Sequence, residues 1–209
     1  MKLHDARYWV NRPIDSEKDW IDDQPNWIES YVHSAYHPHR MLIIDAVKSL
    51  GPIRRLLEVG CGSGSNLLRI HEAFPEMKLF GLDISGKLIA RARDYLPQST
   101  FKVGSYFSVP YANKSFDVVV ADATLMYAGP KDIGRAMNEL DRVTNSIIIV
   151  DRYDKSLAGI RNGHVWARNY PKIFEKLGYE VTTAKIKKED WPQSKGWAKL
   201  GYVWVATTK

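Results

Sequence analysis

The chain has 209 residues, of which 44% are hydrophobic and 26% charged, and its formal net charge is +6. This length suits one well-packed domain, and the composition is that of a globular protein, with no low-complexity tract and no evident repeat. The single cysteine, Cys61, excludes an internal disulfide and a cysteine-based zinc cluster. No apolar run is long enough for a membrane span, and the opening residues MKLHDARYWV lack the basic-then-apolar pattern of a secretion signal. We therefore expect a cytoplasmic protein without a membrane partner.

The net charge is unevenly distributed along the chain. Residues 1–50 carry a net charge of −2, and residues 151–209 carry a net charge of +6. A basic region of this kind could favour an anionic substrate or nucleic acid. The alternative is an ordinary solvated basic surface, which the mixed signs of AKIKKED favour.

Residues 1–37 differ in character from the rest, because they are rich in Trp, Tyr, Asp and Pro. We interpret them as an N-terminal extension that packs against the open end of a sheet, where its tryptophans could form a lid over a substrate or simply pack. The extension is too short to be a separate domain, so residues 38–209 form the main domain. A helix over 38–50 is expected to open that domain, because Ile43 and Val47 share one face.

Strand and helix patterns alternate along the main domain. Short apolar runs predict buried strands, and apolar residues three and four apart predict helices. The expected strands are residues 54–60, 77–83, 100–104, 115–122, 146–151, 179–186 and 200–208. The expected helices after 38–50 are residues 66–74, 86–96, 131–143 and 164–178, and the last two strands form an antiparallel hairpin whose loop holds no obvious helix. The alternation predicts an α/β fold, with a doubly wound, mostly parallel seven-stranded sheet, an antiparallel last strand, helices on both faces and an N-terminal helical, aromatic extension.

Three alternating glycines follow the first strand, in the stretch LLEVGCGSGSN. Gly60, Gly62 and Gly64 would permit positive φ angles and a close approach of a ligand to the backbone. The pattern is G-x-G-x-G rather than the dinucleotide fingerprint, and it lacks the G-K-[ST] ending of a phosphate loop. Asp83 ends the next strand, where a carboxylate can accept hydrogen bonds from both hydroxyls of a ribose. The combination indicates a ligand-binding turn.

The stretches LLEVGCGSGSN, LFGLDIS, SFDVVVAD and RVTNSIIIVD resemble the successive motifs of the class I S-adenosylmethionine-dependent methyltransferases. The resemblance covers roughly residues 40–207, the final strand pair included. It implies S-adenosylmethionine as the cofactor and S-adenosylhomocysteine as the product.

The resemblance also implies which residues hold the cofactor. Glu58 and the glycine turn would surround the methionine part, Asp83 would bind the ribose, and Ile84 would lie against the adenine. Arg40 could pair with the cofactor carboxylate. The implied cofactor-binding residues are Arg40, Glu58, Gly60, Cys61, Gly62, Gly64, Asn66, Asp83, Ile84, Ser105, Tyr106, Ala121 and Asp122.

The substrate class is narrowed by motifs that the sequence lacks. No [DN]-P-P-[YF] follows the fourth strand, where the chain reads ADATLMY, which argues against methyltransferases that modify exocyclic amines of nucleic acids. Cys61 lies inside the cofactor turn, so no cysteine nucleophile is free for C5 methylation of pyrimidines. We therefore expect a small-molecule acceptor and no nucleic-acid partner.

Two acids raise the alternative of a metal-assisted reaction. Asp122 follows the fourth strand and Asp151 the fifth, and catechol-type members of the family hold magnesium with acids in similar places. Their third ligand is usually an Asn next to the second acid, whereas Arg152 stands there in this chain. A cation beside magnesium is unfavourable, so we expect no metal, and the acids would instead bind the cofactor amine, bind substrate or cap loops.

Three residues are candidates for a catalytic role. Tyr127 lies where relatives place residues near the transferred methyl group. Arg152 and His164 follow the fifth strand on the same rim, and His164 could act as a base or stand beside a helix N-cap. For each of them the alternative is an ordinary surface residue.

The sequence is interpreted as an S-adenosylmethionine-dependent methyltransferase that moves a methyl group to an oxygen or nitrogen of a small molecule. The alternatives are an RNA or protein methyltransferase, a homologue that binds the cofactor without methyl transfer, and other chemistry on the same cofactor.

Overall fold

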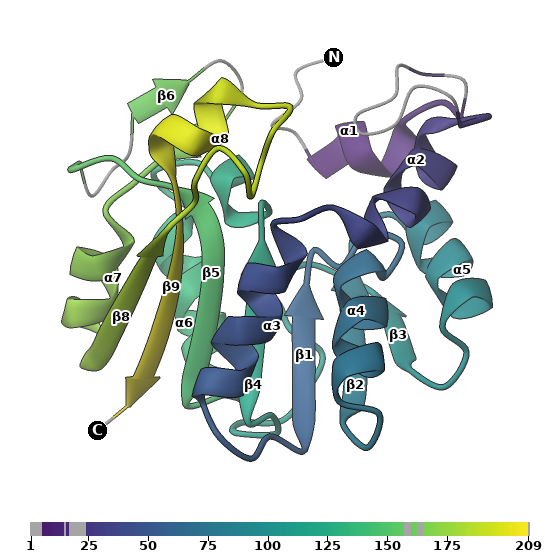
Figure 1. Ribbon diagram of the computed structural model, residues 1–209. Coiled ribbons are helices and arrows are strands. Elements are labelled where there is room, and N and C mark those ends of the chain that lie inside the picture. The colour runs from purple at the N-terminus through teal and green to yellow at the C-terminus, as the bar shows by residue number, and fades with distance from the viewer. Residues whose placement is uncertain (1–5, 15, 17–23, 157–159, 163–164, 209) are drawn as a thin grey trace.

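The computed structural model describes residues 6–14, 16, 24–156, 160–162 and 165–208, and Figure 1 shows how the elements are arranged. In chain order the elements are α1 (Ala6–Asn11), α2 (Trp27–His33), η1 (Ser34–Tyr36), α3 (Arg40–Ser49), β1 (Arg55–Val59), α4 (Ser65–Ala73), β2 (Lys78–Asp83), α5 (Gly86–Tyr95), β3 (Thr100–Val103), β4 (Val118–Asp122), η2 (Leu125–Tyr127), α6 (Ile133–Val143), β5 (Ser146–Arg152), β6 (Ile160–Asn162), β7 (Val165–Ala167), α7 (Tyr170–Lys176), β8 (Tyr179–Lys185), α8 (Lys195–Leu200) and β9 (Gly201–Thr208). Among these described helices, none has both the length and the apolar character that crossing a bilayer requires.

The main sheet has seven strands in the order β3-β2-β1-β4-β5-β9-β8. The first five are parallel, and β9 runs antiparallel to both β5 and β8. In Figure 1 the parallel strands point towards the top of the molecule, where α1, α2 and α8 lie. The predicted sheet, with its antiparallel last strand, is therefore confirmed.

Helices cover both faces of this sheet, as the sequence predicts. Leu56 and Leu57 are neighbours on β1 and both are fully buried, but they belong to two different core clusters because alternate residues of a strand face opposite sides. Helices α3, α4 and α5 pack with Leu56 on one face, and α6 and α7 pack with Leu57 on the other. Figure 1 shows α3 and α4 in front of the sheet and α6 behind it.

Two predicted elements are wrong. The helix expected over 164–178 is restricted to α7, because Pro171 lacks an N–H and is tolerated only in a first turn, and because the Asn169 side chain caps that turn by accepting from Lys172 N at 3.1 Å. The residues before it, Val165–Ala167, form β7 and pair with β6 instead. The loop between β8 and β9 contains the short helix α8, which Ser194 caps.

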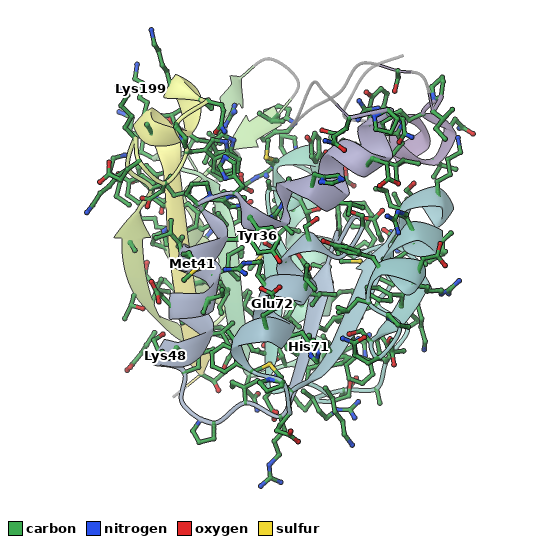
Figure 2. The ribbon with its side chains drawn as sticks, turned by 45° about the vertical axis from the view of Figure 1, so that its right-hand side comes forward. Tyr36, Met41, Lys48, His71, Glu72 and Lys199 are labelled. Carbon is green, nitrogen blue, oxygen red and sulfur yellow. The ribbon has the colours of Figure 1, made fainter. Side chains whose placement is uncertain are left out.

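The N-terminal segment packs across the helices beside the carboxyl end of the sheet. Trp27 of α2 is fully buried against Leu88 of α5. Glu29 forms an ion pair with Arg91 of α5 at 2.8 Å. On the face that carries α3 and α4, Tyr36 lies above Glu72, as Figure 2 shows, and the Tyr36 hydroxyl donates to Glu72 Oε1 at 2.8 Å. These contacts hold the segment against α4 and α5.

Candidate active site

A glycine turn joins β1 to α4 at the carboxyl end of the sheet. Gly60, Gly62 and Gly64 have φ angles of 71°, 54° and 84°, a region that residues with a β-carbon rarely adopt. The Gly62 N–H donates to Asp83 Oδ2 at 2.9 Å, so the end of β2 fixes the turn. The turn therefore follows, at this edge of the sheet, a backbone path that only glycine adopts easily.

Asp83 lies at the end of β2 beside this turn. Its second carboxylate oxygen accepts from Ser85 N at 2.8 Å, which starts α5. Burial raises the pKa of Asp83, while the backbone N–H groups of Ser85 and Gly62 act in the opposite direction.

A buried polar network lies behind the turn and joins four elements or their ends. The Asn66 side chain donates to Glu58 Oε1 at 2.6 Å and to Asp122 Oδ2 at 3.0 Å. His39 Nε2 also lies 3.0 Å from Asp122 Oδ2, and Arg40 approaches it to 3.6 Å. Glu58 Oε2 and Asp122 Oδ1 are buried and have no hydrogen-bond partner among the described residues.

The network sets the charge of its members. Burial raises the pKa of Glu58 to about 8 and lowers the pKa of His39 to about 4, so at neutral pH the carboxyl is largely protonated and the imidazole neutral. Burial would also raise the pKa of Asp122, but His39 and Arg40 outweigh it and the pKa of Asp122 falls below its ordinary value. The site thus holds one carboxylate and one carboxylic acid side by side.

A cavity of about 720 Å³ opens in front of the turn and the network. Its volume is in the range of pockets that bind small molecules. Aromatic side chains supply much of its wall, and they come from every part of the chain: Trp9, Tyr31, Tyr106, Phe107, Tyr127, Trp166, Trp191 and Trp197. The acids Glu58, Asp83, Asp122 and Asp132 and the cations Arg40 and Arg152 also line it.

One wall is a stack of rings that starts at the buried network. His39 stacks on Trp191 with ring centroids 4.1 Å apart, and Trp191 stacks on Trp197 at 4.2 Å with an interplanar angle of 4°. The Arg152 guanidinium lies 5.3 Å from the centroid of the Trp197 ring. The loop before α8 and α8 itself therefore close this side of the cavity.

Asp151 does not share the cavity with Asp122. It is fully buried, accepts from the Tyr170 hydroxyl at 2.5 Å and from Arg152 N at 2.7 Å, and is absent from the cavity wall. Burial raises the pKa of Asp151 to about 7. Within the described part of the chain, no three His, Cys, Asp or Glu side chains are grouped so that they could hold a metal ion. The arrangement gives the metal-assisted alternative no support.

Comparisons with known proteins find methyltransferases. A family model described as a methyltransferase domain matches residues 56–146. The chain is 31% identical over 98 residues to trans-aconitate 2-methyltransferase of Escherichia coli O1:K1 / APEC, a match that covers 46% of this chain and 38% of that protein. It is 36% identical over 100 residues to magnesium-protoporphyrin O-methyltransferase of Rhodobacter capsulatus, covering 46% of this chain and 43% of that protein. The matches thus span less than half the length of these curated relatives.

The fold has a well-matched counterpart among solved structures. Magnesium protoporphyrin IX methyltransferase from Synechocystis PCC 6803 with bound SAM superposes with a TM-score of 0.65 and 15% identity, covering 90% of this chain and 87% of that one. Residues 56–146 thus match a methyltransferase domain, and the fold is shared with a solved methyltransferase that has bound SAM.

Most residues that the sequence predicts to bind the methyltransferase cofactor meet in one cavity. Eleven of them line it: Arg40, Glu58, Gly60, Cys61, Gly62, Asn66, Asp83, Ile84, Ser105, Tyr106 and Asp122. Gly64 and Ala121 do not, because Gly64 begins α4 against Phe101 and Ala121 is buried within β4. The roles of all these residues remain predictions.

The candidate catalytic residues have different outcomes. Tyr127 and Arg152 line the cavity, and His164 lies outside the described residues.

Arg40, a predicted cofactor-binding residue, donates to the Ser34 carbonyl at 2.7 Å and to the Ser34 hydroxyl at 2.6 Å, and it also donates to Asn66 Oδ1. Protein groups thus hold its guanidinium in place at the cavity wall, and its pairing with a cofactor carboxylate stays a prediction.

Sequence reasoning missed His39, Trp191 and Trp197. His39 lies in the stretch HPHR, next to the predicted Arg40, and the two tryptophans lie in a segment interpreted as a plain loop. The two tryptophans, six residues apart and on either side of Gln193 and Ser194, could have indicated that this loop lines a site, because large aromatic residues in a polar loop are often buried or line a site.

Proposed function

We propose that the chain transfers the methyl group of S-adenosylmethionine to an oxygen or nitrogen of a small-molecule acceptor. The observation that carries the proposal is the pair of unpartnered buried oxygens, Glu58 Oε2 and Asp122 Oδ1, on residues that line a cavity beside the glycine turn. Buried carboxyl oxygens without hydrogen-bond partners are costly, so the site suits a ligand that brings a cationic N–H group to them.

The remaining residues of this side fit the other parts of such a ligand. Asp83 offers a carboxylate at the end of β2, suited to a ribose diol, and Gly60 and Gly62 of the glycine turn line the same cavity. Ile84 and Tyr106 supply apolar and aromatic wall for a purine. When bound, S-adenosylmethionine supplies an electrophilic methyl group on a sulfonium.

The acceptor would occupy the part of the cavity that carries Tyr127 and Arg152. Residues there would orient the acceptor atom towards the methyl group, and positioning of this kind can supply much of a rate enhancement. Trp9 and Tyr31 of the N-terminal segment line the same cavity. Their position supports the interpretation of residues 1–37 as a lid, and a cavity walled in this way favours a small acceptor over RNA or a protein.

Titration calorimetry with S-adenosylmethionine and S-adenosylhomocysteine tests the cofactor site, with Asp83→Ala beside the wild-type chain. Hydrogen bonds to a charged group contribute about 1.5–3 kcal/mol each, so the variant should bind at least about tenfold more weakly. Asp94→Ala, which removes an exposed acid from α5, is the matched control and should bind like the wild type.

Mass spectrometry of reaction mixtures then separates the alternatives. Methyl transfer yields S-adenosylhomocysteine and a methylated acceptor in equal amounts. Binding without any product would support a cofactor-binding homologue, and a product other than S-adenosylhomocysteine would support different chemistry on the same cofactor. Absence of binding by either ligand would overturn the proposal.

A further inference from the structure

Arg152 carries a cation into the cavity without a carboxylate in ion-pair contact. It ends β5 and lines the cavity, and its Nε atom is buried and without a hydrogen-bond partner. Among the described residues no carboxylate lies within ion-pair distance of its guanidinium, and no other group accepts a hydrogen bond from it. Asp151 precedes it in the chain but accepts instead from Tyr170 and from the Arg152 backbone N–H.

The other cation that lines the cavity is already bound in the buried network. Arg40 is bound by Ser34 and Asn66 and faces Asp122 at 3.6 Å. A guanidinium that is partly removed from water and unpaired is unfavourable, and its planar fork of N–H donors matches a carboxylate in shape and charge. Arg152 is therefore the cation of this cavity that is built to receive an anion from outside the chain.

The walls around Arg152 are flat and apolar. The guanidinium lies over Trp197, which stacks on Trp191, and Tyr127 meets Trp9 edge to face with centroids 5.5 Å apart. Trp166 lines the same cavity. Planar rings pack well against planar, conjugated ligands and poorly against branched polar ones.

We propose that the methyl acceptor is a planar, conjugated carboxylic acid, whose carboxylate pairs with Arg152 and whose ring or unsaturated body packs against the tryptophan walls. The assignment rests on the proposed function for the identity of the reaction, but it concerns the acceptor part of the cavity alone. The carboxylate is the anchor of the acceptor, and Arg152 selects for it.

Calorimetry with matched pairs of probes tests this selection, in the presence and absence of S-adenosylhomocysteine. The probes are benzoate, trans-cinnamate and indole-3-acetate, each beside its primary amide, and phenyl phosphate as a different anion. We expect at least one acid to bind at least tenfold more tightly than its amide. Arg152→Gln should abolish the preference for acid over amide and leave S-adenosylhomocysteine binding unchanged. Arg152→Lys should keep part of that preference, because the positive charge remains but the planar pair of N–H donors is lost.

Arg54→Gln is the matched control, because it removes the same charge from an exposed position just before β1, at the opposite end of the sheet. It should keep the full preference for acid over amide. A second readout needs no variant: phenylglyoxal should modify Arg152 in the wild-type chain, and the acid but not the amide should slow that modification in peptide mass spectra.

The possible failures are distinguishable. Equal binding of acids and amides, no binding of any acid by a chain that binds S-adenosylhomocysteine, or a preference that survives in Arg152→Gln would each overturn the proposal. Tighter binding of phenyl phosphate than of every acid would assign the site to a phosphate and overturn the carboxylate. Acid selection through Arg152 without any S-adenosylhomocysteine binding would overturn the proposed function alone.

Discussion

Gly60 packs so closely against Thr124 that a β-carbon on Gly60 would lie 1.7 Å from the Thr124 hydroxyl oxygen. The two residues belong to the loops after β1 and β4, which are neighbouring parallel strands. Because Gly60 also has a φ angle of 71°, both its conformation and its surroundings exclude a side chain. The contact fixes the glycine turn against the loop that leads to Tyr127.

Gly60→Ala should therefore destabilise the chain by about 2–5 kcal/mol, since the left-handed conformation costs about 1–2 kcal/mol and overpacking about 1–3 kcal/mol. Gly134→Ala is the control, because Gly134 lies within α6 and a β-carbon there would meet nothing within 4 Å. That variant should be more stable than the wild type by about 0.5–1 kcal/mol. Urea denaturation measures both, and a Gly60→Ala variant as stable as the wild type would contradict the packing described.

Binding of S-adenosylhomocysteine at pH 7 should release a proton from Glu58. Burial raises the pKa of this carboxyl to about 8, so it is largely protonated before binding. A cationic amino group placed beside it favours the ionised form, which lowers the pKa and expels the proton. Calorimetry in phosphate and in Tris, which differ in ionisation enthalpy, should show release of up to about one proton per ligand, and Glu58→Gln should show none. Identical heats in the two buffers would contradict this assignment.

The sheet could be predicted from sequence because each of its strands carries its own local pattern. RRLLEV and FDVVVAD are short apolar runs, and α6 places Ile133, Met137 and Leu140 at helical spacing. The patterns failed where an element is short: α8 has six residues and buries only Trp197, and three residues of β7 were absorbed into a helix. Such elements are fixed by tertiary contacts rather than by periodicity.

The cofactor side of the cavity could also be predicted from local patterns, because the glycine turn directly follows β1 and Asp83 ends β2. The contact between His39 and Asp122 was not, because 83 residues separate them and neither residue has a local pattern that points to the other. The same holds for the stack of Trp191 and Trp197 on His39, which brings residues near the C-terminus onto the start of α3. Contacts of this kind depend on the assembled fold.

His39 should make the folded chain less stable as the pH falls from about 6.5 to about 4. Burial lowers the pKa of His39 in the folded chain to about 4, from an ordinary value of 6.5. Between these two pH values the unfolded chain therefore binds a proton that the folded chain does not bind. The contribution is complete above pH 6.5, is lost as the pH falls, and amounts to at most about 3 kcal/mol. The charged or titratable groups that face His39 are Asp122, Arg40 and His37.

His39→Gln isolates this effect from that of Glu58 and Asp151, whose raised pKa values give the opposite slope with pH. The difference in unfolding free energy between the wild type and the variant should shrink between pH 7 and pH 4.5, as measured by urea denaturation. A difference that stays constant over that range would show that His39 titrates normally in the folded chain.

Arg168 should prove essential to the position of Tyr127, although the two side chains come from different elements. Arg168 is fully buried, donates through one guanidinium nitrogen to the Leu125 carbonyl at 2.9 Å, and donates through the other to the Ala128 carbonyl. These two carbonyls flank Tyr127 on η2, so the guanidinium fork clamps the turn that forms part of the cavity wall. Lys cannot supply two parallel donors, so Arg168→Lys loses at least one charged hydrogen bond to these carbonyls, at a cost of about 1–3 kcal/mol.

Arg135→Lys is the matched control, because Arg135 is exposed on α6 and makes a single hydrogen bond to the Phe107 carbonyl. It should change stability by no more than about 0.5 kcal/mol. Thermal unfolding gives the stability of both variants, and calorimetry gives their affinity for the acid probes, which should fall in Arg168→Lys alone because Tyr127 loses its support. Equal behaviour of the two variants would mean that η2 keeps its conformation without the clamp and that packing of the buried Leu125 and Met126 is enough to hold Tyr127 in the wall.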